Sequence, residues 1–304
     1  LRHLAARTRK LIADRGMDTR KMRRLIESLI DESRLRAAAV DFGLVTVSLS
    51  DRAPLELYKE DIPQGRVVDY LMASASFPGF QMTFIDDKAF IDGGLYDNCP
   101  INMLARKGYT RIVAVRTLGL GVTRKILYPG LTITTISPSE PLGGMMSFTP
   151  EAIRRSMSMG YYDALRQLKG LHGRTYCIDI GGLTEEACNE MLASLPDAKV
   201  LALGRMLGAS GMPARELWSR VIVPRLSRSM RLEADASSIT FIVRLAEALA
   251  SAKGINKYAV YPFPDLVSSA ICGPLKNVQG LGFRQVELCM AAQRILEEIQ
   301  LGEA

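Results

Sequence analysis

A pair of glycines that directly follows an apolar run constrains the fold of this chain more than any other feature. Asp92-Gly93-Gly94 comes after Ala89-Phe90-Ile91, whose apolar and aromatic residues favour a strand. Adjacent glycines allow a positive φ or a close approach of two backbones at little steric cost. The sequence therefore predicts a tight turn with Asp92 at a strand end. Taken alone, such a turn usually only reverses the chain, so its surroundings decide whether the carboxylate does chemistry.

The segments on both sides of this turn predict an α/β unit. Upstream, Thr83-Phe84-Ile85 and 89–91 are expected to form a hairpin across Asp86-Asp87-Lys88. Downstream, a helix is expected with Pro100 as its first residue and Asn98 or Cys99 as its cap, and it would stop near Gly108. A buried strand over 111–116 would follow. Strand, acid, turn, helix and strand follow one another within a short span. This order indicates an α/β fold with its functional edge at the strand ends.

Further motifs occur in order around the turn. Ala73-Ser74-Ala75-Ser76-Phe77-Pro78 lies upstream and Asn98-Cys99-Pro100 downstream, and Ile136-Ser137-Pro138 and a helix ending in 160–165 follow. This order resembles the second half of a patatin-like phospholipase domain, from about residue 35 to about residue 169. The resemblance implies a fragment of a patatin-like three-layer α/β sandwich over residues 1–183. A mainly helical C-terminal region over residues 184–304 would follow it.

The resemblance also implies a reaction, because that family hydrolyses lipid acyl esters with a Ser-Asp dyad. Asp92, in the motif Asp92, Gly93 and Gly94, would be the dyad acid. It would take the proton of a serine hydroxyl and later help water to cleave the acyl-enzyme. The two histidines, His3 and His172, have no recognisable partner, which fits a dyad better than a Ser-His-Asp triad. No cofactor and no metal are expected.

The nucleophile is the missing part of this prediction. The family supplies its serine from a Gly-x-Ser-x-Gly elbow after a glycine-rich oxyanion loop, and this sequence contains neither motif. The nearest segments are 156–160, which has a helical pattern, and 208–212, whose second glycine is misplaced. Ser74 and Ser76 are expected to be lining or structural residues, since they precede Pro78 at a helix-to-loop boundary.

Three explanations of the missing elbow stay open. Both missing motifs precede the acid in the family order and the chain begins at Leu1, so we expect a truncated N-terminus and a chain that is inactive alone. The second explanation is a natural, non-catalytic patatin-like module that binds lipid or a protein partner. The third is a serine that another chain supplies.

The positive charge of the chain is concentrated at its beginning. The net charge is +7, and arginines and lysines far outnumber acids through Arg36. Apolar residues at helical spacing predict two amphipathic helices, broken near Gly16-Met17-Asp18. This segment is interpreted either as a solvated helical face or as a peripheral contact with anionic lipid headgroups, which suits a hydrolase of lipid or acyl-ester substrates. Nucleic acid is not an expected partner, because no aromatic residues interleave the basic ones.

Composition bears on compartment and on the C-terminal half. The five cysteines are widely spaced without a Cys-x-x-Cys pair, which argues against a zinc site or a disulfide framework and favours a reducing, cytoplasmic location. No apolar stretch reaches membrane-spanning length. The segment 119–124 resembles part of a phosphate loop but lacks its ending, so it is interpreted as a turn. The expected C-terminal helices are Ala187–Leu195, Ala198–Leu207, Ser238–Ala252 and Gln285–Leu301.

Overall fold

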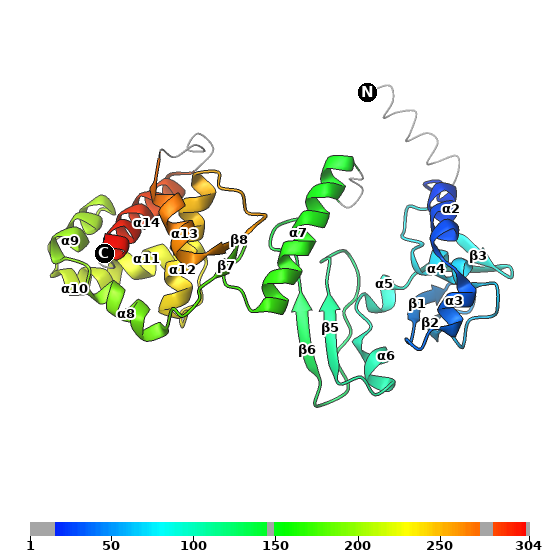
Figure 1. Cartoon of the computed structure of the whole chain (residues 1–304). Coiled ribbons are helices and arrows are strands. Elements are labelled where there is room, and N and C mark those ends of the chain that lie inside the picture. The colour runs from blue at the N-terminus through cyan, green and yellow to red at the C-terminus, as the bar shows by residue number, and fades with distance from the viewer. Residues whose placement is uncertain (1–15, 145–148, 274–281, 302–304) are drawn as a thin grey trace, which may run out of the picture. The chain divides into compact units, whose positions relative to one another are not determined.

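The computed structural model describes residues 16–144, 149–273 and 282–301 and shows a mixed α/β chain (Figure 1). The chain divides into two compact units, Leu1–Ile136 and Ser137–Ala304. The predicted α/β class with a helical C-terminal region is confirmed. The predicted boundary at 183/184 concerns the extent of the family domain and stays a prediction. The first of the two basic helices falls within residues 1–15, outside the described residues.

The first unit contains a four-stranded sheet and a separate pair of strands. Its helices are α2 (Arg20–Leu29), α3 (Glu32–Ala37), α4 (Val67–Ser74), α5 (Gly94–Asp97) and α6 (Ile101–Arg106). Its strands are β1 (Gly43–Ser48), β2 (Ala53–Tyr58), β3 (Thr83–Ile85), β4 (Lys88–Asp92), β5 (Arg111–Val115) and β6 (Thr132–Ile136). The four-stranded sheet is antiparallel in the order β2-β1-β4-β3, and β5 pairs with β6 in parallel.

The predicted hairpin is confirmed and places the strand that carries the acid. Strands β3 and β4 pair antiparallel, with Ile85 opposite Lys88. Asp86 and Asp87 connect them with φ values of 48° and 60°. Two consecutive positive φ angles are the requirement of the tight turn that matches the twist of antiparallel strands, and aspartate tolerates them better than most residues. The turn thus fixes the register that ends β4 at Asp92.

Two expectations for the following segments are corrected. Helix α6 begins at Ile101 with Pro100 at the N-cap, and neither Asn98 nor Cys99 caps it. Asn98 instead ends the short helix α5, which the sequence pattern did not predict. The predicted stop near Gly108 is confirmed, because α6 ends at Arg106 and Gly108 has a φ of 91°.

Strand β5 is not the fully buried strand that was expected. Ile112 and Ala114 are buried, whereas Val113 and Val115 are 54% and 67% exposed. Side chains alternate between the two faces of a strand, and here only one face of β5 is covered. A continuous run of apolar letters cannot distinguish this case from a strand that is covered on both faces.

The second unit is mostly helical. Its helices are α7 (Pro150–Lys169), α8 (Glu185–Ala193), α9 (Asp197–Met206), α10 (Ala214–Leu217), the π-helix η1 (Trp218–Ile222), α11 (Val223–Met230), α12 (Ser238–Ala252), α13 (Phe263–Ile271) and α14 (Phe283–Leu301). Strands β7 (Cys177–Asp179) and β8 (Val260–Pro262) pair in parallel. Helix α12 packs against α8, α11, α13 and α14 and lies at the centre of the core. Among the described residues, no helix is long and apolar enough to cross a membrane.

Local signals determine where several of these helices begin and end. The Thr149 hydroxyl accepts a hydrogen bond from the Ala152 N–H and caps α7, and Gly170 ends that helix in the left-handed conformation, both as the sequence predicts. Helix α12 spans the predicted residues, and its N-cap Ser237 accepts from the Thr240 N–H. Helices α8, α9 and α14 begin or end within about two residues of expectation, which is the usual uncertainty of helix ends.

Candidate active site

Asp92 occupies the last position of β4, and two backbone hydrogen bonds hold the turn that follows it. The Asp92 N–H donates to the Ser76 carbonyl at 3.0 Å, and the Gly93 N–H donates to the Ser74 carbonyl at 3.3 Å. Across the sheet, Asp92 lies opposite Thr46 in β1. The Thr46 side chain is fully buried and its hydroxyl donates to the Ile91 carbonyl at 2.9 Å. Two backbone hydrogen bonds to Ser74 and Ser76 and the pairing with β1 therefore hold the strand end that carries the acid.

The first glycine of the turn is needed for space. Its φ is −65°, an ordinary value for any residue, so a positive φ is not the reason for glycine here. A Cβ atom at Gly93 would lie 2.0 Å from the Val45 carbonyl oxygen. The backbones of β1 and of the turn approach so closely that no side chain fits between them.

The carboxylate of Asp92 is fixed on one side and open on the other. Its Oδ1 accepts a hydrogen bond from the Gly94 N–H at 2.7 Å, which fixes the side chain over the first turn of α5. Within the described part of the chain, Oδ2 accepts no hydrogen bond, and the residue is half-buried. A half-buried carboxylate with one free oxygen is suited to accept a proton from a hydroxyl group placed beside it.

The serines upstream of the turn have structural roles. Ser76 is buried, and its hydroxyl forms hydrogen bonds with the Met72 carbonyl at 2.8 Å and with the Thr83 hydroxyl at 2.6 Å. Ser74 ends α4 and contributes its carbonyl to Gly93. The Ala-Ser-x-Ser segment thus supports the acid through its backbone, and Ser76 has no free hydroxyl for nucleophilic attack.

A loop that the sequence suggested only as a turn packs against the site. The Val122 N–H donates to the Gly94 carbonyl at 2.9 Å, and the Asn98 N–H donates to the Val122 carbonyl at 2.7 Å. A Cβ atom at Gly121 would lie 2.6 Å from the same Gly94 carbonyl. The guanidinium of Arg124 stacks over the Tyr96 ring, 4.3 Å from its centre. The glycines of the segment were its only sequence signal, and one of them, Gly121, marks a close backbone approach.

The other serine, cysteine and histidine side chains considered as catalytic groups lie in surroundings that do not suit catalysis. Ser156 and Ser158 are in the interior of α7, and Ser210 is in the connection between α9 and α10, so neither segment is a strand-to-helix elbow. Burial raises the pKa of the Cys99 thiol, although Arg116 opposes the shift, and the raised pKa disfavours the reactive thiolate. His172 pairs with Ile178 through its backbone, and His3 lies outside the described residues.

Metal ligands do not gather in the part of the chain that the structure describes. No group of three or more His, Cys, Asp or Glu side chains is placed there to hold an ion. All five cysteines are free thiols, of which Cys272 is exposed. The site therefore rests on the carboxylate of Asp92 and on the backbone around it.

The fold and the turn define an α/β segment with an acid at a strand end. The family model described as patatin-like phospholipase matches residues 1–105, about a third of the chain and the part that contains this turn. The resemblance predicted from the motifs is thereby confirmed for residues 1–105, whereas the motifs at 136–138 and 160–165 lie outside the match. No curated protein and no solved structure matches the chain.

Proposed function

We propose that this chain carries the acid half of a lipid acyl hydrolase site, with Asp92 as the acid/base partner of a serine outside residues 1–304. The observation that carries the proposal is the attachment of Asp92. The strand end fixes its backbone, Gly94 fixes one carboxylate oxygen, and the second oxygen is left open. The match of the surrounding segment to a lipid hydrolase family supports the choice of reaction.

The proposed mechanism has two stages. In the first, the free oxygen of Asp92 takes the proton of the serine hydroxyl as the serine oxygen attacks the ester carbonyl. Asp92 then gives this proton to the alcohol oxygen as the ester C–O bond breaks, which leaves an acyl-enzyme and an ionised carboxylate. In the second, Asp92 takes a proton from water as the water oxygen attacks the acyl carbonyl, and it returns the proton to the serine oxygen as the fatty acid leaves. The hydrogen bond from the Gly94 N–H would hold the carboxylate in one orientation through both stages.

The test compares two Asp→Asn variants of one hairpin in the complete protein. We expect Asp92→Asn to lower hydrolysis of a short-chain acyl ester by about a hundredfold or more, the usual contribution of a general base. Asp87→Asn is the matched control, because it changes the same charge in the β3–β4 turn and asparagine tolerates its φ of 60°. Unchanged melting temperatures would show that both variants fold. Full turnover by Asp92→Asn would exclude Asp92 as the acid.

A rival function is favoured by the missing elbow. A patatin-like module without a nucleophile would bind lipid or a protein partner and would not hydrolyse esters. The coding sequence upstream of Leu1 distinguishes the two functions. A Gly-x-Ser-x-Gly segment in the same frame supports the hydrolase, and a continuous frame without one supports the binding module.

We also propose that α2 contacts anionic lipid, as expected for a cytoplasmic, peripheral hydrolase. Helix α2 buries none of its residues, and Leu25 and Leu29, one turn apart, are 59% and 72% exposed. Lys21 and Arg24 are on the same helix and form no ion pair in the described part of the chain. Flotation with phosphatidylserine vesicles should fall for Lys21→Gln/Arg24→Gln. Equal flotation of wild type and variant would contradict this contact.

A further inference from the structure

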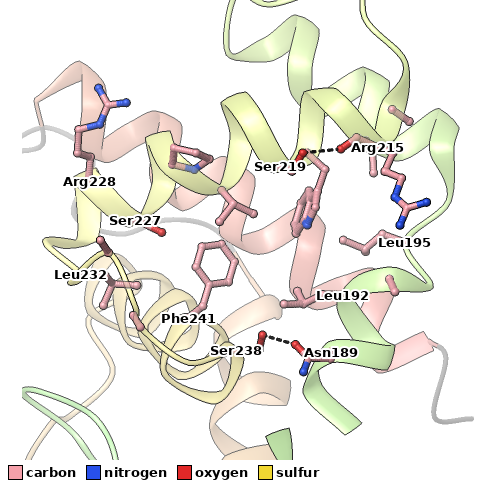
Figure 2. A pocket seen from close by; sticks show the side chains of 18 of the residues that line it. Asn189, Leu192, Leu195, Arg215, Ser219, Ser227, Arg228, Leu232, Ser238 and Phe241 are labelled. Carbon is pink, nitrogen blue, oxygen red and sulfur yellow. Dashed lines mark hydrogen bonds between the residues drawn. The ribbon is translucent and has the colours of Figure 1, made fainter. Parts of the chain in front are cut away.

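The helical unit contains a large cavity that the proposed reaction does not use. Its volume is about 1010 Å³, and residues from α8, α9, α10, η1, α11 and α12 line it. Figure 2 shows Phe241 at its centre, with Ser227, Arg228 and Leu232 towards one end and Arg215 and Leu195 towards the other. This volume lies at the upper end of the range for small-molecule sites, and such sites combine an apolar lining with a few polar groups.

The apolar middle of the cavity is built by an irregular helix. Trp218 begins the π-helix η1, and its ring packs edge-on against Phe241 with 6.4 Å between the ring centres. Pro224 has no N–H to donate to Arg220 four residues earlier, and the Val223 N–H donates instead to the Trp218 carbonyl five residues earlier. This widened turn presents Trp218 and Ser219 to the cavity. Single π-turns within helices occur frequently at functional sites.

The rim of the cavity carries charges of both signs. Arg215 and Arg228 supply the cations, and Asp197 and Glu233 supply the anions. Among the described residues, none of these four side chains takes part in an ion pair. Two positive and two negative groups balance, so the rim complements a headgroup that itself carries both charges better than it complements a simple anion.

The two ends of the cavity differ in their free hydrogen-bonding groups. At the Arg215 end, the Ser219 hydroxyl donates to the Arg215 carbonyl at 3.0 Å. At the Arg228 end, the Ser227 hydroxyl has no hydrogen-bond partner among the described residues. A hydroxyl beside a guanidinium is a suitable pair of donors for a phosphate group, and Glu233 lines the same cavity as a partner for an ammonium group.

We propose that this cavity binds a zwitterionic lipid with a single chain, a lysophospholipid. Its acyl chain would lie along Trp218 and Phe241, its phosphate at Ser227 and Arg228, and its ammonium group at Glu233. One apolar strip between polar ends accommodates one chain. The choice of a phospholipid rests on the proposed hydrolase function, whereas the existence of an amphiphile site rests on the cavity alone.

The only tryptophan of the chain lines the cavity, so its emission reports binding directly. We expect saturable changes in Trp218 emission when myristoyl lysophosphatidylcholine is added below its micelle concentration to the whole chain. Ser227→Phe fills the cavity and should weaken binding, measured by calorimetry, by about tenfold or more. Ser229→Phe is the matched control on the same helix: it is exposed, does not line the cavity and should bind as wild type. Melting curves confirm folding.

The headgroup is tested with ligands that share one chain. Arg228→Gln should lower the affinity for lysophosphatidylcholine by about tenfold, which corresponds to the loss of one charged hydrogen bond. The affinity for tetradecanol should not change. Myristate should bind more weakly than lysophosphatidylcholine, because the carboxylate of Glu233 repels the carboxylate of myristate. The proposal would be overturned if the two Ser→Phe variants had equal effects on binding or if all three ligands bound with equal affinity. It would also be overturned if the chain self-associated and Ser227→Phe abolished that self-association. If Asp92→Asn keeps full turnover while Ser227→Phe loses lipid, only the hydrolase function fails.

Discussion

The two units of this chain are stabilised by different kinds of contact. In the helical unit, 31 buried residues form one continuous core around α12. In the described part of the first unit, two small clusters contain three buried apolar residues each, and other buried apolar residues, such as Met103 and Ile112, belong to neither cluster. The first unit depends more on close backbone contact, as at Gly93 and Val45, and on ion pairs between its segments.

This difference explains where each candidate site gets its order. Asp92 is positioned by hydrogen bonds of its backbone at a strand end and by the Gly94 N–H, which donates to its carboxylate. The cavity of the helical unit is positioned by a packed core on which Trp218 and Phe241 lie. Small changes of the backbone should therefore damage the first site, whereas the second should respond mainly to changes in volume and charge.

The largest effect is expected inside the helical unit, at its buried charge. Glu247 is buried and accepts hydrogen bonds from the N–H groups of Arg174, Thr175 and Tyr176 at 2.7 to 2.8 Å, and it pairs with Arg244 at 2.8 Å. Glu247→Gln leaves the half-buried Arg244 without a counter-charge and removes the carboxylate that accepts three backbone hydrogen bonds, so it should lower the free energy of unfolding by about 4 kcal/mol.

The control for this variant is Glu190→Gln, an exposed change of the same kind on α8. Denaturant unfolding of the whole chain measures both, and Glu190→Gln should lie within about 0.5 kcal/mol of wild type. If both variants unfold alike, the carboxylate of Glu247 does not organise the loop before β7, and the contrast between the units is weaker than we describe.

The next effect is expected at the turn of the first unit. Gly93→Ala places a methyl group against the Val45 carbonyl, which belongs to the backbone of β1 and cannot move aside. We expect a loss of about 3 kcal/mol in the stability of the first unit, with the helical unit unaffected. Gly119→Ala is the control, because the closest atom to its Cβ would be 3.7 Å away. Hydrogen exchange followed by mass spectrometry resolves the units, and increased exchange in α12 would contradict their independence.

The smallest effect is expected at the ion pair that joins α2 to α4, between Arg23 and Asp69, and it should depend on pH. Burial tends to raise the pKa of Asp69, but hydrogen bonds from Arg23 and Arg66 outweigh it and hold that pKa below its ordinary value. A group whose pKa is lowered by folding stabilises the folded protein at pH values above its unfolded pKa, which is about 3.9 for aspartate. This contribution to stability is lost as the pH falls through the folded pKa. Asp69→Asn should therefore cost about 1 kcal/mol at neutral pH and nothing in stronger acid.

The pH series needs the Asp87→Asn control, since Asp87 forms no ion pair in the described part of the chain. Thermal unfolding of the three proteins between neutral and acidic pH separates the effect of one ion pair from the general loss of stability in acid. A constant difference between wild type and Asp69→Asn over the whole range would contradict the assignment.

Features that depend on neighbouring residues were predictable from the sequence. The Asp86-Asp87 turn, the Thr149 cap, the Gly170 stop and the span of α12 each follow from residues within one or two turns of chain. The position of Asp92 at a strand end belongs to this class, because an apolar run and two glycines predict it.

Features that depend on distant residues were not predictable. The reason for Gly93 is a carbonyl on β1, and the reason for Gly121 is a carbonyl in α5, which only the folded chain brings near. The π-turn at Trp218 follows from Pro224, a local signal, but the cavity that it opens is made by several helices together. The one-sided burial of β5 also depends on what covers the strand.

The half-site itself is tested most directly by labelling. We propose that this chain holds the acid and that the nucleophile lies outside it, so a fluorophosphonate probe should label no serine of residues 1–304 above the level of the heat-denatured protein. Mass spectrometry of the intact chain measures this. Stoichiometric labelling of one serine in the folded chain would contradict the account, because the chain would then contain its own activated nucleophile.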